Sequence, residues 1–205
     1  MWKSYCFWCI VFTLLRSFRS QQSEQNQPAR PQPHQKNLQS QRRHQACRIP
    51  PEGACADTTK KILSDGRWCL EIHPNNFIAP GRPLARHHIV ADNGIAKTIA
   101  EIVPSNQSII DIGAGIGQYQ VWFMNNHKTF KRYLAYDGAP NVEEFTWGTV
   151  RYLNIAQQVQ WYPHEISDWV LSLEVGEHLD KQYESVFIQN LHRVNTKGMW
   201  NGIPM

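Results

Sequence analysis

The chain has 205 residues, of which 41% are apolar and 19% are charged, and it contains eight Trp. This is the composition of a globular protein, and it excludes a wholly disordered or collagen-like chain. The net charge of +4 is unevenly divided: residues 1–46 carry seven Lys/Arg against one Asp/Glu, whereas residues 47–205 carry 14 against 16. The basic character therefore belongs to residues 1–46, and the rest shows no charge pattern of a nucleic-acid partner.

Residues 1–20 are an apolar leader whose core, residues 5–15 (YCFWCIVFTLL), follows Lys3. A run of 11 residues suits a signal peptide better than a membrane span, which needs about 20. The alternatives are a short uncleaved anchor formed by residues 2–18 and a mitochondrial presequence. We expect the secretory pathway, with the protein either secreted or held in the lumen as a type II membrane protein.

Residues 21–46 hold nine Gln and three Pro. Such a segment cannot bury enough apolar surface to offset its ordering entropy, so we expect a disordered linker. Beyond it lie Cys47, Cys55 and Cys69; this odd number allows at most one internal disulfide and leaves the pairing open. The glycosylation sequon that begins at Asn106 agrees with secretion.

Strand and helix patterns alternate in the second half of the chain, after an N-terminal segment at residues 47–89. Asp92 is expected to cap a helix that ends before Pro104. Short apolar runs predict strands at residues 108–112, 133–136, 150–155 and 169–173, and the last helix is expected at residues 179–197, ended by Gly198. This alternation predicts an α/β fold with a doubly wound, mostly parallel sheet.

The most informative segment is DIGAGIGQY, residues 111–119. A strand runs into Gly113, Gly115 and Gly117, where a helix begins, and glycines let a backbone approach a ligand closely. The dinucleotide fingerprint G-x-G-x-x-G does not fit, because residue 118 is Gln. With Asp111 in the strand, the loop favours a cationic or polar ligand group over a pyrophosphate. The alternative is a glycine-rich turn without a ligand.

Asp137 stands at the end of the next predicted strand. Ligands of open α/β sheets lie outside the carboxyl ends of the strands, so a carboxylate there is placed to bind the hydroxyls of a ribose. The alternative is a simple strand-end turn, since Asp137-Gly138 is also a good turn dipeptide.

Taken together, DIGAGIGQY, LAYDGAPNVEEFT and DWVLSLEVGEHL (residues 111–119, 134–146 and 168–179) resemble class I S-adenosylmethionine-dependent methyltransferases. The resemblance covers residues 90–198 and implies a Rossmann-like methyltransferase sheet. It implies that Asp111 and the three glycines bind the methionine end of S-adenosylmethionine and that Asp137 binds the ribose. Asn154, in place of an acid, would contact adenine, and Glu174 would line the same site.

Glu174, Glu177 and His178 follow the last predicted strand and resemble the E-x-x-E-H element of metal-assisted O-methyltransferases. The resemblance implies a divalent metal held by these three side chains. The alternative is a metal-free site in which Glu174 lines the cofactor site and His178 begins a helix or acts as the general base. Glu177 and His178 are the candidate catalytic residues.

The end of the chain departs from this family, whose sheet continues with a fifth strand and an antiparallel hairpin. Residues 199–205 (MWNGIPM) carry turn signals instead. We therefore expect an incomplete domain that lacks its last strands, with residues 169–173 as an uncovered edge. The expected function is methyl transfer to an O or N nucleophile of a small-molecule, glycan or lipid substrate. The alternative is a truncated, non-catalytic relative that binds the cofactor weakly or acts as a binding module.

Overall fold

A computed structural model describes residues 47–52, 54–55, 63–71 and 90–202. The predicted leader, residues 1–20, and the predicted linker, residues 21–46, lie outside the described residues, as does much of the segment 47–89. Within the described ranges, no helix is both long enough and apolar enough to span a membrane.

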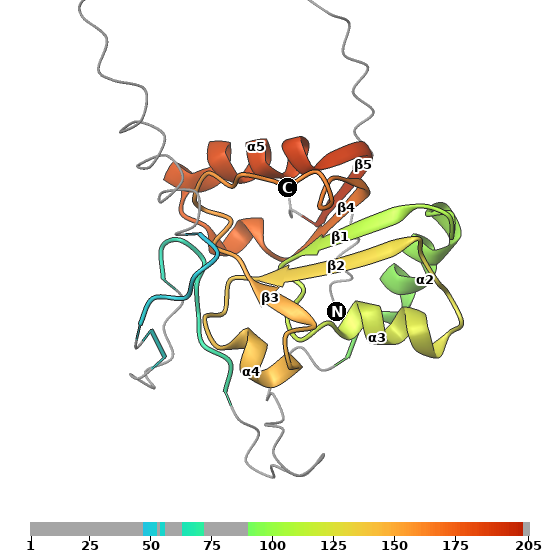
Figure 1. Cartoon of the computed structure of the whole chain (residues 1–205), viewed down its shortest axis with the longest axis horizontal. Coiled ribbons are helices and arrows are strands. Elements are labelled where there is room, and N and C mark those ends of the chain that lie inside the picture. Colours follow the sequence, from blue (N-terminus) through green and yellow to red (C-terminus); the bar gives the residue numbers. More distant parts are fainter. Residues whose placement is uncertain (1–46, 53, 56–62, 72–89, 203–205) are drawn as a thin grey trace, which may run out of the picture.

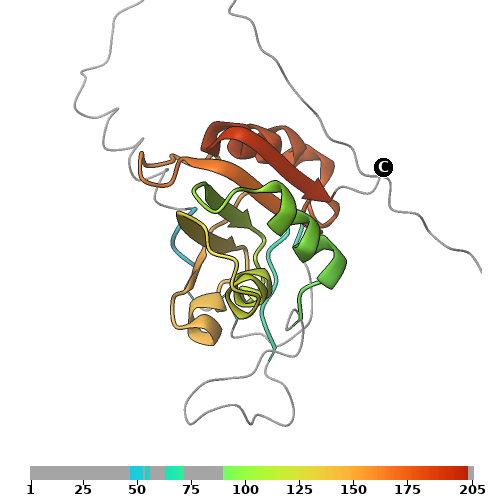
Figure 2. The same ribbon diagram turned by 90° about the vertical axis from the view of Figure 1, so that its right-hand side faces the viewer.

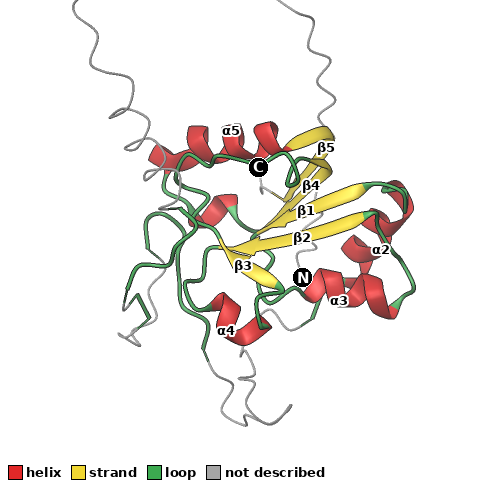
Figure 3. Ribbon diagram, in the orientation of Figure 1, coloured by secondary structure: helices red, strands yellow, loops and turns green. Residues whose placement is uncertain are grey.

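Five strands form a single sheet in which every neighbouring pair is parallel (Figures 1 and 3). The order is β3-β2-β1-β4-β5. The strands are β1 (Ser108–Ile112), β2 (Arg132–Asp137), β3 (Val150–Tyr152), β4 (Ser167–Leu173) and β5 (Asn195–Gly202). The chain winds outward from β1 to β3 and then returns to the other side of β1, which confirms the doubly wound α/β prediction.

Four α-helices alternate with these strands along the described part of the chain. Asp92 caps the first, as predicted, because its Oδ1 accepts a hydrogen bond from the backbone N–H of Ile95 at 2.8 Å. The helices are α2 (Asn93–Ile102), α3 (Gln118–Asn125), α4 (Val142–Thr146) and α5 (Glu184–Val194), with two short 3-10 helices, η1 (Gly176–His178) and η2 (Lys181–Tyr183), before α5. The last α-helix is thus shorter at both ends than residues 179–197.

Alternate residues of the strands point to opposite faces, and each face has its own core. On one face Ile110 and Val170 pack with Phe187 and Leu191 of α5. On the other face Ile109 packs with α2 and α3, and Ala135 and Val150 pack with α4. Figure 2 shows α5 and α3 on opposite sides of the strands. The sheet is therefore covered on both faces, and β1 at its centre is buried throughout.

The prediction of an uncovered β4 is wrong, because β5 pairs with it in parallel over most of its length. Gly198 was expected to end a helix but lies within β5, where a Cβ would overlap the ring of Trp169. Asn195 begins the strand, and its Nδ2 donates to the carbonyl of Leu191 at 2.9 Å, which closes the preceding helix. Gly198 therefore allows close packing of β5 against Trp169. A sequence pattern does not distinguish this role from that of a glycine that ends a helix.

The first described residues belong to the same folded unit. Cys47 is fully buried in the core beside α5, and its carbonyl accepts a hydrogen bond from the backbone N–H of Asn154. Arg48 makes a two-pronged ion pair with buried Glu165, with both N–O distances at 2.8 Å. Its guanidinium also lies over the ring of Tyr162. The segment that precedes the sheet in sequence is thus anchored to it.

Candidate cofactor site

A cavity of about 740 Å³ opens at the carboxyl ends of the strands. This is where ligands bind in open α/β sheets, and the volume is typical of ligand pockets. The lining includes the ends of β1, β2 and β4, the residues after β3, and a segment from before α2. Its residues are Asp65, Gly66, Trp68, Val90, Asp92, Ile95, Asp111, Ile112, Gly113, Gly115, Gln118, Tyr119, Asp137, Gly138, Leu153, Asn154, Ile155, Leu173, Glu174, Val175, His178 and Leu179.

The glycine loop, residues 113–117, joins β1 to α3. Gly113, Gly115 and Gly117 all have positive φ, at 82°, 57° and 84°. Residues that carry a side chain disfavour this conformation. A Cβ on Gly113 would in addition overlap Cγ2 of Val175. Gly113 and Gly115 line the cavity. Gly117 is the N-cap of α3 and is not among the lining residues, so its place is structural.

Asp111 lies in the middle of the sheet with only 2% of its surface exposed. The hydroxyl of Tyr133 donates to its Oδ2 at 2.7 Å. Burial raises the pKa of Asp111 to about 7, the Tyr133 hydroxyl opposes this shift, and the charge of Asp137 adds to it. A cationic ligand group would stabilise the ionised form, as the prediction for the methionine end requires.

Asp137 is the last residue of β2, and its carboxylate holds the glycine loop in place. Its Oδ2 accepts from the backbone N–H of Gly115, and its Oδ1 accepts from the backbone N–H of Ala139, both at 2.8 Å. Burial raises its pKa to about 6, and these two hydrogen bonds act in the opposite direction. The strand-end turn is therefore real, yet the carboxylate also lines the cavity. Each oxygen keeps a further acceptor position, so the turn and a ligand contact are compatible.

Asn154 follows β3 and lines the cavity, but both ends of its amide are engaged. Its Nδ2 donates to Oδ2 of Asp65, and its Oδ1 accepts from the backbone N–H of Ala156, each at 3.0 Å. The side chain therefore lies at the predicted place, with one N–H donor and one oxygen lone pair already used by the protein.

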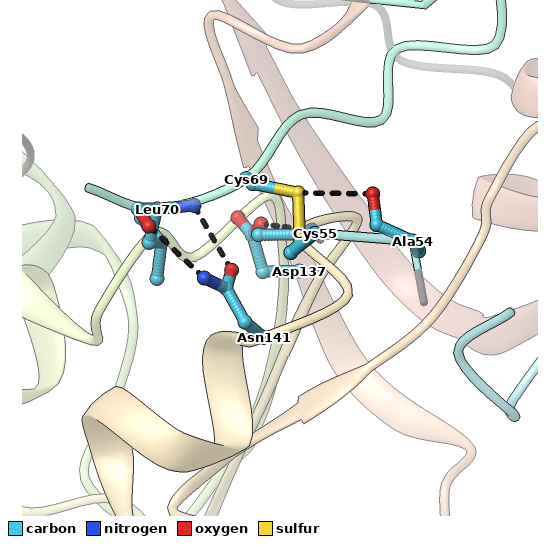
Figure 4. The surroundings of a disulfide bond; sticks show 7 residues. Ala54, Cys55, Cys69, Leu70, Asp137 and Asn141 are labelled. Carbon is cyan, nitrogen blue, oxygen red and sulfur yellow. Dashed lines mark hydrogen bonds between the residues drawn. A yellow bond between two sulfur atoms is a disulfide. The ribbon is translucent and has the colours of Figure 1, made fainter. Parts of the chain in front are cut away.

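Sequence reasoning missed the strap, residues 63–71, which forms a wall of the cavity through Asp65, Gly66 and Trp68. A disulfide between Cys55 and Cys69 ties the strap to the preceding chain, with a Cα–Cα distance of 5.7 Å. Leu70 and Asn141 exchange two hydrogen bonds at 2.9 Å (Figure 4). Asp137 is among the residues that surround the disulfide in Figure 4. The expectation of at most one internal disulfide is confirmed for Cys47, Cys55 and Cys69. The strap's only sequence signal was Cys69, whose pairing the sequence left open.

The loop after β4 forms the adjoining wall, because Leu179 pairs with Asp65 of the strap. Glu174 has a positive φ of 56°, and the chain then enters η1. Glu174 and His178 line the cavity, whereas Glu177 does not. Partial desolvation, and then the neighbouring carboxyl of Glu174, raise the pKa of Glu177 to about 7. All three side chains are exposed, so this wall is the accessible mouth of the cavity.

The structure does not support a metal at Glu174, Glu177 and His178. Among the described residues, no three His, Cys, Asp or Glu side chains come together in a group that could hold a metal ion. Glu177 and His178 are consecutive in η1, and successive residues of a 3-10 helix point about 120° apart. They therefore do not converge with Glu174 on one point.

No protein-family model and no curated protein matches the chain. Among solved structures it is similar to a protein from Anabaena variabilis described as a putative methyltransferase of an antibiotic biosynthesis pathway (22% identity, TM-score 0.42). It is also similar to a phosphoethanolamine N-methyltransferase from Haemonchus contortus (20%, 0.41) and to the amino pentose methyltransferase CalS10 from Micromonospora echinaspora (15%, 0.40). These matches cover 56%, 53% and 50% of this chain. The chain spans 47%, 25% and 44% of the respective structures, about half their length or less.

Proposed function

We propose that this chain binds S-adenosylmethionine in the cavity and transfers its methyl group to an O or N nucleophile. One observation carries the proposal: two buried carboxylates, Asp111 and Asp137, meet the glycine loop at the carboxyl edge of a doubly wound sheet. A ligand that fits these two carboxylates carries hydroxyls and a positive charge, as the ribose and the sulfonium-bearing amino acid do.

The charges of the lining argue against a dinucleotide. Five Asp or Glu side chains line the cavity, and none of its described lining residues is Lys or Arg. A pyrophosphate would place two negative charges near Asp111 and Asp137, whose own ionisation burial already disfavours. A cationic ligand instead relieves that cost.

The roles of the chain's residues follow from their places. Asp137 would accept hydrogen bonds from ribose hydroxyls, and Asp111 would stabilise the charged amino-acid end. The bound cofactor supplies an electrophilic methyl group. Glu174 and His178 lie at the exposed mouth, where a small-molecule, glycan or lipid acceptor could reach them, and Glu177 or His178 would take up the proton that the acceptor loses.

Calorimetry on the full chain tests the proposal with S-adenosylhomocysteine, S-adenosylmethionine and NAD. We expect the first two to bind and NAD not to bind. Asp137→Ala should weaken binding by about 1–3 kcal/mol, the loss typical of a charged hydrogen-bond partner. Binding of NAD alone would overturn the assignment, and binding without any turnover across acceptor classes would favour a non-catalytic relative.

We also propose that the chain enters the secretory pathway. The apolar leader, the Cys55–Cys69 disulfide and the sequon at Asn106 support this, since disulfides persist in oxidising compartments. Asn106 is exposed in the turn between α2 and β1. Expression in secretory cells followed by glycosidase treatment and fractionation tests the proposal. A glycosidase-sensitive form that Asn106→Gln abolishes is the expected result, and a purely cytosolic or mitochondrial protein would contradict it.

A further inference from the structure

The Asp65 carboxylate, from the strap, lies beside Asn154 at the β3 end of the cavity. Its Oδ2 accepts from Nε of Arg67 at 2.7 Å and from Nδ2 of Asn154 at 3.0 Å. From the described residues, its Oδ1 receives only a long contact of 3.4 Å from the backbone N–H of Arg67. The side chain is 14% exposed and lines the cavity. A carboxylate accepts about four hydrogen bonds, so Oδ1 keeps an acceptor position for a ligand.

The two ends of the cavity differ in chemistry. At the β1 and β4 end, Tyr119 lies among the carboxylates of Asp92, Asp111 and Glu174. At the β3 end the lining is mostly apolar or aromatic and includes the polar side chains of Asp65 and Asn154. Leu179 also lies here, because it pairs with Asp65. The apolar and aromatic members are Trp68, Leu153, Ile155 and Leu179.

This difference orients a ligand whose ribose lies on Asp137. Because β2 lies between β1 and β3 in the sheet, Asp137 stands between the two ends. The acidic end suits the cationic amino-acid part of the cofactor. The apolar, aromatic end suits a flat purine, because rings of this kind pack well against apolar and aromatic side chains. The purine edge then lies near Asp65 and Asn154.

We propose that Asp65 reads the purine of the bound cofactor by accepting a hydrogen bond from its exocyclic amino group. This inference rests on the proposed function. Asn154 is a positioning residue: its amide is already bonded to Asp65 and to the backbone of Ala156, so it holds the carboxylate. Arg67 holds the same carboxylate from the other side.

A carboxylate that recognises the purine in this way distinguishes between purines. It accepts from a 6-amino purine and repels the carbonyl oxygen of a 6-oxo purine, which offers no donor at that position. A buried acceptor left without its partner costs more than the hydrogen bond itself contributes. A wall that merely packs against the ring would bind both purines alike.

The test is calorimetry on the full, disulfide-bonded chain with S-adenosylhomocysteine and its 6-oxo analogue, S-inosylhomocysteine. We expect the wild-type chain to prefer the 6-amino ligand by at least about tenfold. Asp65→Asn, whose amide can both donate and accept, should reduce this preference to about threefold or less. The matched control Glu101→Gln, which is exposed in α2 and does not line the cavity, should keep the wild-type preference.

Each outcome is decisive for one of the two proposals. If neither ligand binds the wild-type chain, the proposed function fails. If S-adenosylhomocysteine binds but the 6-oxo analogue binds equally well, or if Asp65→Asn keeps the full preference, the role of Asp65 is wrong. The wild-type comparison requires no variant, so the inference stays testable even if Asp65→Asn does not fold.

Discussion

The glycine loop and the strap face the same cavity but are held in place by different means. The loop is continuous with β1 and α3, and the backbone N–H groups of Gly113 and Ala114 donate to the carbonyl of Tyr136. The strap is held by residues far away in the sequence: Leu70 pairs with Asn141, 71 residues on, and Asp65 with Asn154, 89 residues on. A disulfide adds a covalent tie.

This difference indicates which part of the site depends on distant contacts for its position. The loop forms whenever the sheet forms, because neighbouring elements determine its path. The strap is correctly placed only when distant contacts and an oxidised disulfide act together, so it is the wall that opens at lower free-energy cost. Changes in the loop should therefore abolish binding, whereas changes in the strap should weaken it by degrees.

The largest expected effect is that of Gly113→Ala. The substitution places a side chain at a φ of 82° and drives its Cβ into Val175; the left-handed backbone alone costs about 1–2 kcal/mol. We expect binding of S-adenosylhomocysteine to fall by more than about tenfold in calorimetry, as the strain of overpacking adds to the backbone cost.

Gly148→Ala is the matched control for this substitution. Gly148 has a similar φ of 74°, but a Cβ there meets no atom within 4 Å among the described residues. It should lower the melting temperature slightly and leave binding unchanged. If both variants bind equally well, the contact between Gly113 and Val175 does not shape the site.

The second effect is the dependence of stability and cofactor affinity on pH through Asp111 and Asp137. The folded-state pKa values of Asp111 and Asp137, about 7 and about 6, exceed the ordinary value of 3.8. The folded state therefore binds more protons than the unfolded state. Stability from these groups is full below about pH 4 and is lost as the pH rises to about 7. A cationic cofactor favours the ionised Asp111, so its affinity should rise about tenfold between pH 6 and 8.

Asp111→Asn separates this effect from other titrations. The variant removes the ionisable group but keeps an acceptor for the Tyr133 hydroxyl. Its melting temperature should fall less between pH 5 and 8 than that of the wild-type chain, and its cofactor affinity should vary less with pH. Identical profiles for both proteins would show that Asp111 does not titrate in this range.

A third, smaller effect concerns the strap. Reduction, or the double substitution Cys55→Ser and Cys69→Ser, removes a cross-link over 14 residues; loops of this size contribute about 3 kcal/mol against the unfolded chain. We expect affinity for S-adenosylhomocysteine to fall about three- to tenfold while the sheet still melts cooperatively, because the freed strap opens locally. Unchanged affinity after reduction would show that the other contacts suffice.

The same contrast explains what could be predicted from the sequence. The strand at residues 108–112 and the cap at Asp92 were predicted correctly, because apolar runs and capping residues are local features. The fifth strand was missed because Gly198 and Asn201-Gly202 are turn residues in most contexts, and only the Trp169 ring shows why glycine is needed. The contact between Asp65 and Asn154 joins residues that no local pattern connects.

The smallest effect, and the sharpest test of the comparison, is that of Asn141→Ala. Asn141 stands before α4 without capping it through its side chain, so the substitution removes only the two hydrogen bonds to Leu70 (Figure 4). In the oxidised chain the disulfide still holds the strap, and affinity should fall by less than about threefold, about the net contribution of one ordinary hydrogen bond.

In the reduced chain the same substitution removes a remaining tie, so its effect should grow to about tenfold. Two ties that restrain one segment are expected to show such coupling. Calorimetry on the four combinations of oxidised, reduced, wild-type and variant chain measures it. Strictly additive effects would show that the disulfide and Asn141 do not hold the strap jointly, and the strap would then resemble the loop, fixed by its neighbours alone.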